Sequence, residues 1–250
     1  MMIMTIAAKE LRALFLSPMA WAILAVVQGI VAYFFLVLLD NFLQLQPRLA
    51  AVPDAPGISS IVVAPLFATV SVILLLIVPL LTMRLISEER RNKTLSLLIS
   101  APVSISDIVI GKFIGVMAFL LLLLALICLM PLSLLFGTSI DMGLFLAGLI
   151  ALTLLLASFT AVGLYMSTLT RQPIVAAVST FGILLLLWIL DIANATGSNP
   201  TILSYLSIMN HYQNLLQGIF SSSDIIYYLL FITVFLVLSI RRLDAERLPH

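Results

Sequence analysis

Apolar residues occur in long runs that are separated by short polar stretches. Six of these runs are each long enough to cross about 30 Å of hydrocarbon as a helix, allowing for short ends and tilt. They cover roughly Met19–Leu39, Ile61–Met83, Phe113–Phe136, Gly143–Met166, Ile174–Leu190 and Ile225–Ile240. Backbone polar groups in lipid must be hydrogen-bonded internally, which only helices and closed barrels achieve. The pattern therefore predicts an all-α polytopic membrane protein with six transmembrane helices, of which the last two are short.

The first 18 residues are too polar to span a membrane but are periodic. At 100° per residue, one face carries apolar side chains and the opposite face carries Lys9 and Arg12. The apolar face consists of Ile3, Ile6, Ala7, Leu11, Leu14 and Phe15. Residues 1–18 are thus predicted to form an amphipathic interfacial helix that Pro18 ends. Glu10 lies near its apolar edge and has two interpretations: a carboxylate reaching the helix rim, or an ion pair with a base of Arg84–Lys93.

The largest polar stretch, Arg84–Lys112, contains five of the twelve Lys and Arg residues. Ser87 is predicted to cap a helix with Glu88 and Glu89 in its first turn. Leu95, Leu98 and Ile99 then share one face, and Ala101-Pro102 ends the helix. A capping box, Ser104-x-x-Asp107, begins the next helix. Charge runs at membrane borders are often only solvated anchors, but capping signals at both ends favour a short amphipathic helix held between two spans.

Two further segments carry informative patterns. In the segment from about residue 200 to residue 220, apolar and polar residues alternate. This pattern predicts one or two short helices that dip into the outer leaflet. His211 in this segment has no second His, Cys or carboxylate cluster nearby in the sequence, which favours a hydrogen-bonded structural histidine over a metal ligand. The fourth span repeats small residues four apart, as in Gly163 and Ser167, which lets helices approach closely. We expect packing within the chain there, with a dimer seam as the alternative.

Composition and charge agree with this pattern. The chain is 63% hydrophobic and 9% charged, whereas a soluble domain carries about a quarter charged residues. With both termini inside, eleven Lys and Arg residues lie on the cytoplasmic side and only Arg48 lies outside. The sequence therefore predicts a multi-pass protein with cytoplasmic termini. Cys128 is the single cysteine and forms no intrachain disulfide.

The chain lacks the residues that ion-driven transport and ATP hydrolysis require. The six runs contain no Asp, Glu, Lys, Arg or His, although ion-driven carriers need such groups at mid-membrane. No G-x-x-x-x-G-K-[ST] motif occurs. We therefore expect no enzyme activity, with no catalytic residue, metal ligand or bound cofactor in this chain. A transport protein without such groups needs an external source of energy. In the predicted orientation, the Arg84–Lys112 stretch faces the cytoplasm, where ATP is found.

Motifs along almost the whole chain resemble a known family. They are Lys9-Glu10-Leu11, Ser17-Pro18, Thr82–Arg91, Thr94-Leu95, Leu97-Leu98, Ala101–Ser104, Gly111-Lys112, Gly163-Leu164, Ser167–Thr170, Asn210-His211-Tyr212 and Ser239–Leu243. In order and spacing these resemble ABC-2 type permeases, closest to the gliding-motility (Gld) and nitrous-oxide-reductase maturation (Nos) branch. Two departures concern the polar stretch: Lys93 stands where the family often has Gly, and Ser96 where it often has Glu.

The resemblance implies a connecting helix at residues 1–18 and a six-span permease domain at 19–250, with a coupling helix at about 88–100. It implies two separate ATPase subunits that bind ATP and Mg²⁺, and a second permease protomer, identical or different. The expected ATPase contacts are Glu88, Glu89, Arg90, Arg91, Thr94, Leu95 and Leu98. Lys9, Glu10 and Arg12 would lie on the connecting helix beside them.

The function expected from this resemblance is that of a permease subunit in a bacterial inner membrane, which couples ATP hydrolysis by the separate subunit to export or to mechanical work across the membrane. An apolar path suits a lipid-linked or amphiphilic cargo, and in the mechanical case the partners would include periplasmic accessory proteins. The alternative is a membrane scaffold that recruits a cytoplasmic partner to a surface assembly. No nucleic-acid partner is expected.

Overall fold

The long apolar runs form six helices in a computed structural model that describes residues 2–49, 56–94, 103–138, 140–195, 207–219 and 221–247. These helices are α2 (Pro18–Leu49), α3 (Ala64–Thr82), α6 (Ile105–Ser133), α7 (Met142–Leu169), α8 (Pro173–Ala195) and α11 (Ser222–Arg247). Five of them are long and apolar enough to cross a membrane, while the apolar part of α8, Pro173–Ile189, is shorter. No strand occurs among the described residues. The predicted all-α polytopic membrane fold is confirmed.

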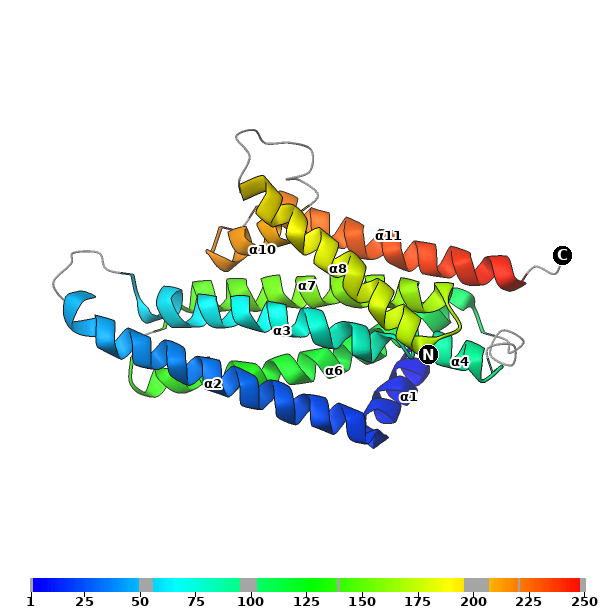
Figure 1. The fold of residues 1–250 in the computed structure, drawn as a ribbon, viewed down its shortest axis with the longest axis horizontal. Helices are drawn as coiled ribbons and strands as arrows, with labels where there is room; N and C mark the ends of the chain where they lie inside the picture. Colours follow the sequence, from blue (N-terminus) through cyan, green and yellow to red (C-terminus); the bar gives the residue numbers. More distant parts are fainter. Residues whose placement is uncertain are drawn as a thin grey trace.

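Shorter elements join the long helices: α1 (Met2–Leu16), the π-helical turn η1 (Ser59–Val63), α4 (Ser87–Arg91), the 3-10 turn η2 (Leu134–Phe136) and α10 (Ile208–Leu216). Helices α2, α3, α6, α7 and α11 run lengthwise and α8 lies obliquely, and α1, α4 and the end of α11 lie toward the same end of the bundle (Figure 1). We call it the basic end, because it carries Lys9, Arg12, Arg84, Arg90, Arg91, Lys93, Lys112, Arg171, Arg241 and Arg242. The two ends of the chain thus approach the same side, as the charge pattern predicts.

Helix α7 is the central element of the bundle. It packs against α3, α6, α8, α10 and α11. Of its most apolar 18-residue stretch, 56% is buried, compared with 17% for the corresponding stretch of α11. Its small side chains Ala147, Ala151 and Ala161 are buried inside the chain. Gly163 lies so close to α3 that a Cβ on it would be 2.1 Å from Thr82 Oγ1. The small-residue stripe therefore serves packing within the chain, as expected, and these residues are not available for a dimer seam.

The outer element is described from residue 207 onward and contains α10. Ser207 begins this helix, and its hydroxyl accepts the N–H of Asn210 at 3.3 Å. The Tyr212 hydroxyl donates to the Phe67 carbonyl of α3 at 2.8 Å. Burial raises the pKa of Tyr212, which keeps its hydroxyl protonated as a donor. The apolar face of α10 is therefore fixed to the bundle, and residues 200–206 and 220 of the expected element lie outside the described part.

His211 on α10 has the structural role that its isolation in the sequence predicts. Its buried Nδ1 lies 2.6 Å from Oδ1 of Asp224 at the start of α11. Its ring also stacks on Tyr227 with centroids 4.2 Å apart. Within the described residues, no group of three or more His, Cys, Asp and Glu side chains could hold a metal ion. The histidine thus joins α10 to α11.

Candidate functional site

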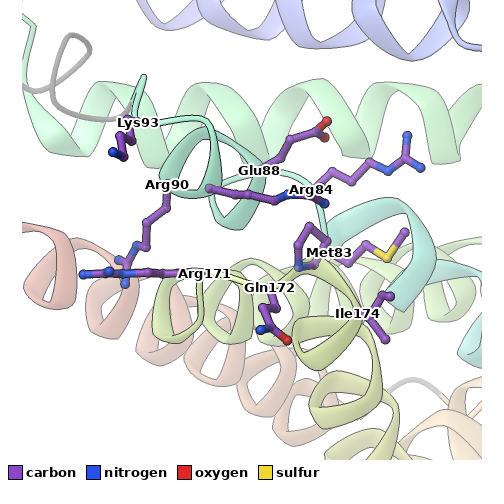
Figure 2. Close-up of a pocket in the computed structure, with 10 residues that line it drawn as sticks. Met83, Arg84, Glu88, Arg90, Lys93, Arg171, Gln172 and Ile174 are labelled. Carbon is purple, nitrogen blue, oxygen red and sulfur yellow. The ribbon is translucent and has the colours of Figure 1, made fainter.

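The polar stretch between α3 and α6 forms a cleft at the basic end. Its volume is about 1090 Å³, and α4, the turn before it and the α7–α8 connection enclose it. The lining residues are Met83, Arg84, Glu88, Arg90, Arg91, Lys93, Arg171, Gln172, Pro173 and Ile174. Figure 2 shows Arg90 of α4 extending toward Arg171 across the cleft. Three of the expected ATPase contacts, Glu88, Arg90 and Arg91, are therefore brought together here.

Helix α4 begins differently from the expectation. The sequence predicts Ser87 as the cap, but Ser87 lies at the first helical position and its hydroxyl donates to the Met83 carbonyl. The cap comes from Ser167 of α7, whose Oγ accepts the N–H groups of Ile86 and Ser87, each at 3.0 Å. Ser167 Oγ also donates to the Met83 carbonyl at 3.1 Å. The Ser167 hydroxyl thus uses its full hydrogen-bonding capacity, two accepted bonds and one donated bond. The start of α4 is thereby fixed to α7.

Helix α4 also ends earlier than expected. The predicted helix runs from about Glu88 to Ser100, whereas the described helix ends at Arg91. Lys93 adopts a left-handed conformation with φ 59°. The Lys93 N–H bonds the Arg90 carbonyl at 3.3 Å and the Thr94 N–H bonds the Glu89 carbonyl at 2.9 Å, which is the Schellman arrangement that terminates helices. Leu95, Leu98 and the rest of 95–102 lie outside the described residues.

Replacing Lys93 with glycine is expected to stabilise this turn by about 0.5–1 kcal/mol, because a residue with a Cβ is strained in the left-handed region. The measurement is the free energy of unfolding of purified protein, from SDS titration in mixed micelles. Asn92→Gly is the control, since Asn92 has φ −81° and gains nothing. Equal losses in both variants would contradict the prediction.

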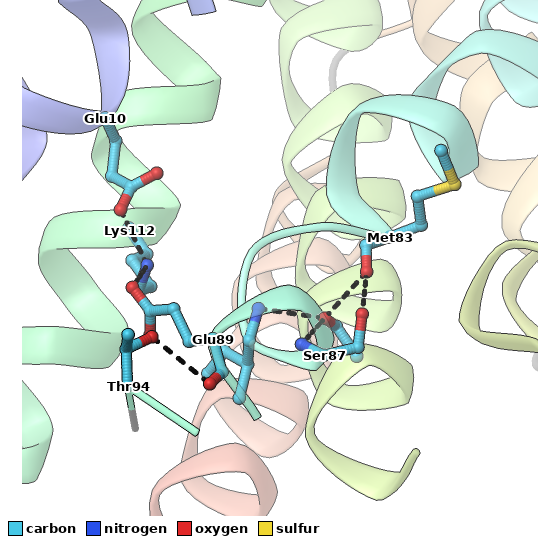
Figure 3. A network of polar contacts seen from close by, with 8 residues as sticks. Glu10, Met83, Ser87, Glu89, Thr94 and Lys112 are labelled. Atoms are coloured by element: carbon cyan, nitrogen blue, oxygen red, sulfur yellow. Dashed lines mark hydrogen bonds and ion pairs between the residues drawn. The ribbon is translucent and has the colours of Figure 1, made fainter. Parts of the chain in front are cut away.

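A buried charge cluster lies on the other side of α4 (Figure 3). Lys112 Nζ on α6 lies 2.6 Å from Glu10 Oε1 of α1 and 2.8 Å from Glu89 Oε1 of α4. Only 2% of the Lys112 side chain is exposed, compared with 17% for Glu10 and 21% for Glu89. The buried Glu89 Oε2 has no hydrogen-bond partner among the described residues. One ammonium group therefore joins three helices.

Two glycines of α6 bring α1 close enough for this cluster. A Cβ on Gly111 would lie 2.8 Å from Ile6 Cβ, and a Cβ on Gly115 would lie 2.8 Å from Glu10 Cβ. Glu10 thus forms an ion pair, as one of its two interpretations proposes, but its partner is Lys112 and not a base of Arg84–Lys93. Lys9 and Arg12 are exposed on the opposite face of α1, as the amphipathic pattern predicts.

Sequence reasoning did not include Lys112 or Ser167 among the site residues. The spacing of Gly111 and Gly115 around Lys112 is a signal for a close helix approach, whereas nothing near Ser167 marks it as a cap. The structure also separates Glu88 from Glu89: Glu88 is exposed and lines the cleft, while Glu89 is half-buried and faces Lys112. Thr94 is exposed just after the turn.

Comparison with known proteins gives one family. A sequence model described as ABC-2 family transporter protein matches residues 4–248, which is nearly the full chain. No curated protein matches the chain. The matched region includes α1, the cleft, the Lys112 cluster and α10.

Proposed function

The chain belongs to the ABC-2 family of transporter proteins, and on this premise we propose that it is the permease subunit that receives mechanical work from a separate ATPase. The finer resemblance to the Gld and Nos branch remains a prediction. The proposed location is a bacterial inner membrane, with the basic end and both termini in the cytoplasm. Two ATPase subunits, which bind the ATP and Mg²⁺, and a second permease protomer complete the proposed assembly.

The observation that carries this proposal is the way α4 is held. Its start is fixed to α7 through Ser167, and Glu89 ties it to α6 and, through Lys112, to α1. Its remaining face, with Glu88 and Arg91, is exposed. A push on that face would move the ends of three helices together, since packed elements shift as units and deform little. Such a short, tied helix suits a coupling element.

The proposed ATPase contacts are Glu88, Arg90, Arg91 and Thr94, together with Leu95 and Leu98 beyond the described residues. We assign Glu89 a positioning role, because its carboxylate is occupied by Lys112. The output remains export of an apolar or amphiphilic cargo, or mechanical work passed to periplasmic partners. A direct test is affinity purification from native membranes in several mild detergents. We expect recovery of a nucleotide-binding protein, and its absence in every detergent would favour the scaffold alternative.

Replacing Glu88 with alanine is expected to weaken ATPase binding about tenfold, equivalent to 1.4 kcal/mol, without loss of permease stability. The reason is that Glu88 is exposed and makes no ion pair among the described residues. The measurement is the affinity of purified ATPase for the permease in nanodiscs, together with stimulation of ATP hydrolysis.

The matched control is Asp244→Ala, which removes an exposed carboxylate from α11 at the same end and should leave binding unchanged. Glu89→Ala should lower permease stability as well, which separates the two neighbours. Unchanged affinity in Glu88→Ala would remove this residue from the contact.

A further inference from the structure

The cleft at the basic end has an unusual balance of charge. Among the described residues, its lining includes five cationic side chains, Arg84, Arg90, Arg91, Lys93 and Arg171, and one carboxylate, Glu88. Arg90 and Arg171 come from different elements and extend toward the same space (Figure 2). Like charges held near one another repel, and an anion between them would lower that repulsion. The geometry therefore favours an anionic ligand.

The first turn of α8 adds to this preference. Pro173 begins the 23-residue helix, and both Gln172 and Pro173 line the cleft. The start of a helix carries a partial positive charge and presents N–H groups that have no partner within the helix. This helix start lies beside the five basic side chains, so that the helix dipole and the side-chain charges act on the same space.

The wall of the cleft continues into an apolar surface. Met83 and Ile174 belong to the lining. Ile174 is 74% exposed, and Val175 and Val178, which follow it on α8, are 48% and 66% exposed. Exposed apolar side chains on a membrane-embedded helix are compatible with lipid acyl chains, which are as apolar as they are. A ligand whose charged part occupies the cleft could thus extend an apolar part along α8 without leaving the hydrocarbon.

We propose that the cleft binds the anionic headgroup of a phospholipid whose acyl chains lie along the first turns of α8. Anionic lipids are attracted to basic residues at the membrane border, and the guanidinium groups of Arg84, Arg90 and Arg171 suit phosphate oxygens in geometry and charge. Binding of an acidic protein surface would require only the positive charge of the cleft. The apolar continuation along α8 is what favours a lipid over a protein segment or a free anion.

This inference does not depend on the proposed ATPase partner. Arg84 and Arg171 are outside the set of residues expected to contact the ATPase, and they carry the test. Because Arg90 on α4 and Arg171 between α7 and α8 share the site, a bound headgroup would join the proposed coupling element to the start of α8. Lipid composition would then influence the position of α4.

The experiment measures lipid binding to the purified full chain in a neutral detergent by native mass spectrometry, with cardiolipin, phosphatidylglycerol and phosphatidylcholine. Anionic lipids are expected to bind at least tenfold more tightly than phosphatidylcholine. Arg171→Gln, and separately Arg84→Gln, should weaken anionic-lipid binding about tenfold, as loss of one charge-assisted contact implies. Binding should also weaken as salt is raised.

Arg241→Gln is the matched control, because it removes one exposed positive charge at the same end but from outside the cleft. Equal weakening in Arg171→Gln and Arg241→Gln would overturn the proposal in favour of diffuse attraction. Competition by pyrophosphate or glycerol phosphate at equal concentration would show that the apolar part contributes nothing. Unchanged lipid binding with lost ATPase affinity in Arg171→Gln would instead assign the cleft to a protein partner.

Discussion

Replacing Lys112 with methionine is expected to lower the free energy of unfolding by about 3–5 kcal/mol. Removing one partner of a buried ion pair leaves an uncompensated charge, and here two would remain. Glu10 Oε1 and Glu89 Oε1 both contact the same ammonium group, so its loss would leave two carboxylates facing each other. SDS titration of purified protein in mixed micelles measures the change.

The control for this variant is Lys9→Met, which removes the same group from the exposed face of α1 and should change stability by less than about 0.5 kcal/mol. A triple variant, Glu10→Gln, Glu89→Gln and Lys112→Met, should recover most of the loss, because it leaves no charge in this cluster. If Lys112→Met were as mild as Lys9→Met, the cluster would not hold the three helices. If the triple variant folds but no longer responds to the ATPase, the charges themselves transmit the movement.

The sequence predicts the spans and the amphipathic helix well, because both follow from one-dimensional patterns. Long apolar runs specify α2, α3, α6, α7 and α11, and the period of 3.6 residues places Lys9 and Arg12 on the exposed face of α1. The partner of Glu10 could not be chosen in the same way. It depends on α1 lying across α6, which only the glycine pair at 111 and 115 indicates.

The capping of α4 shows a different kind of limit. Ser87 has the right residue type for a cap, but the acceptor comes from Ser167, 80 residues away in the chain. Once Ser167 fills that role, the Ser87 hydroxyl is left to bond the Met83 carbonyl. Local capping rules assume that a helix end is served by its own neighbours, and a short helix packed against a long one need not follow them. The early end at Arg91 is likewise set by Lys93 adopting a backbone conformation that its residue type does not favour.

Replacing Gly163 with alanine is expected to destabilise the bundle by about 3 kcal/mol or more, the upper range for overpacking. The added Cβ would lie 2.1 Å from Thr82 Oγ1 and 2.7 Å from Thr82 Cβ. Thr82 is fully buried and its hydroxyl bonds the Val78 carbonyl of its own helix at 2.9 Å. The side chain therefore has no free volume to enter, and α3 and α7 would have to separate.

Gly182→Ala on α8 is the matched control, since nothing lies within 4 Å of its added Cβ. That variant should gain up to about 1 kcal/mol from the higher helix propensity of alanine. Adding Thr82→Ala to Gly163→Ala should recover part of the loss, because it removes the nearest atom but not the Cβ. Equal stability of the two glycine variants would show that α3 and α7 are not in close contact. Because Ser167 lies one turn beyond Gly163 and caps α4, a shift of α7 should also reduce ATPase stimulation, which connects packing at the centre of the bundle to the proposed coupling element.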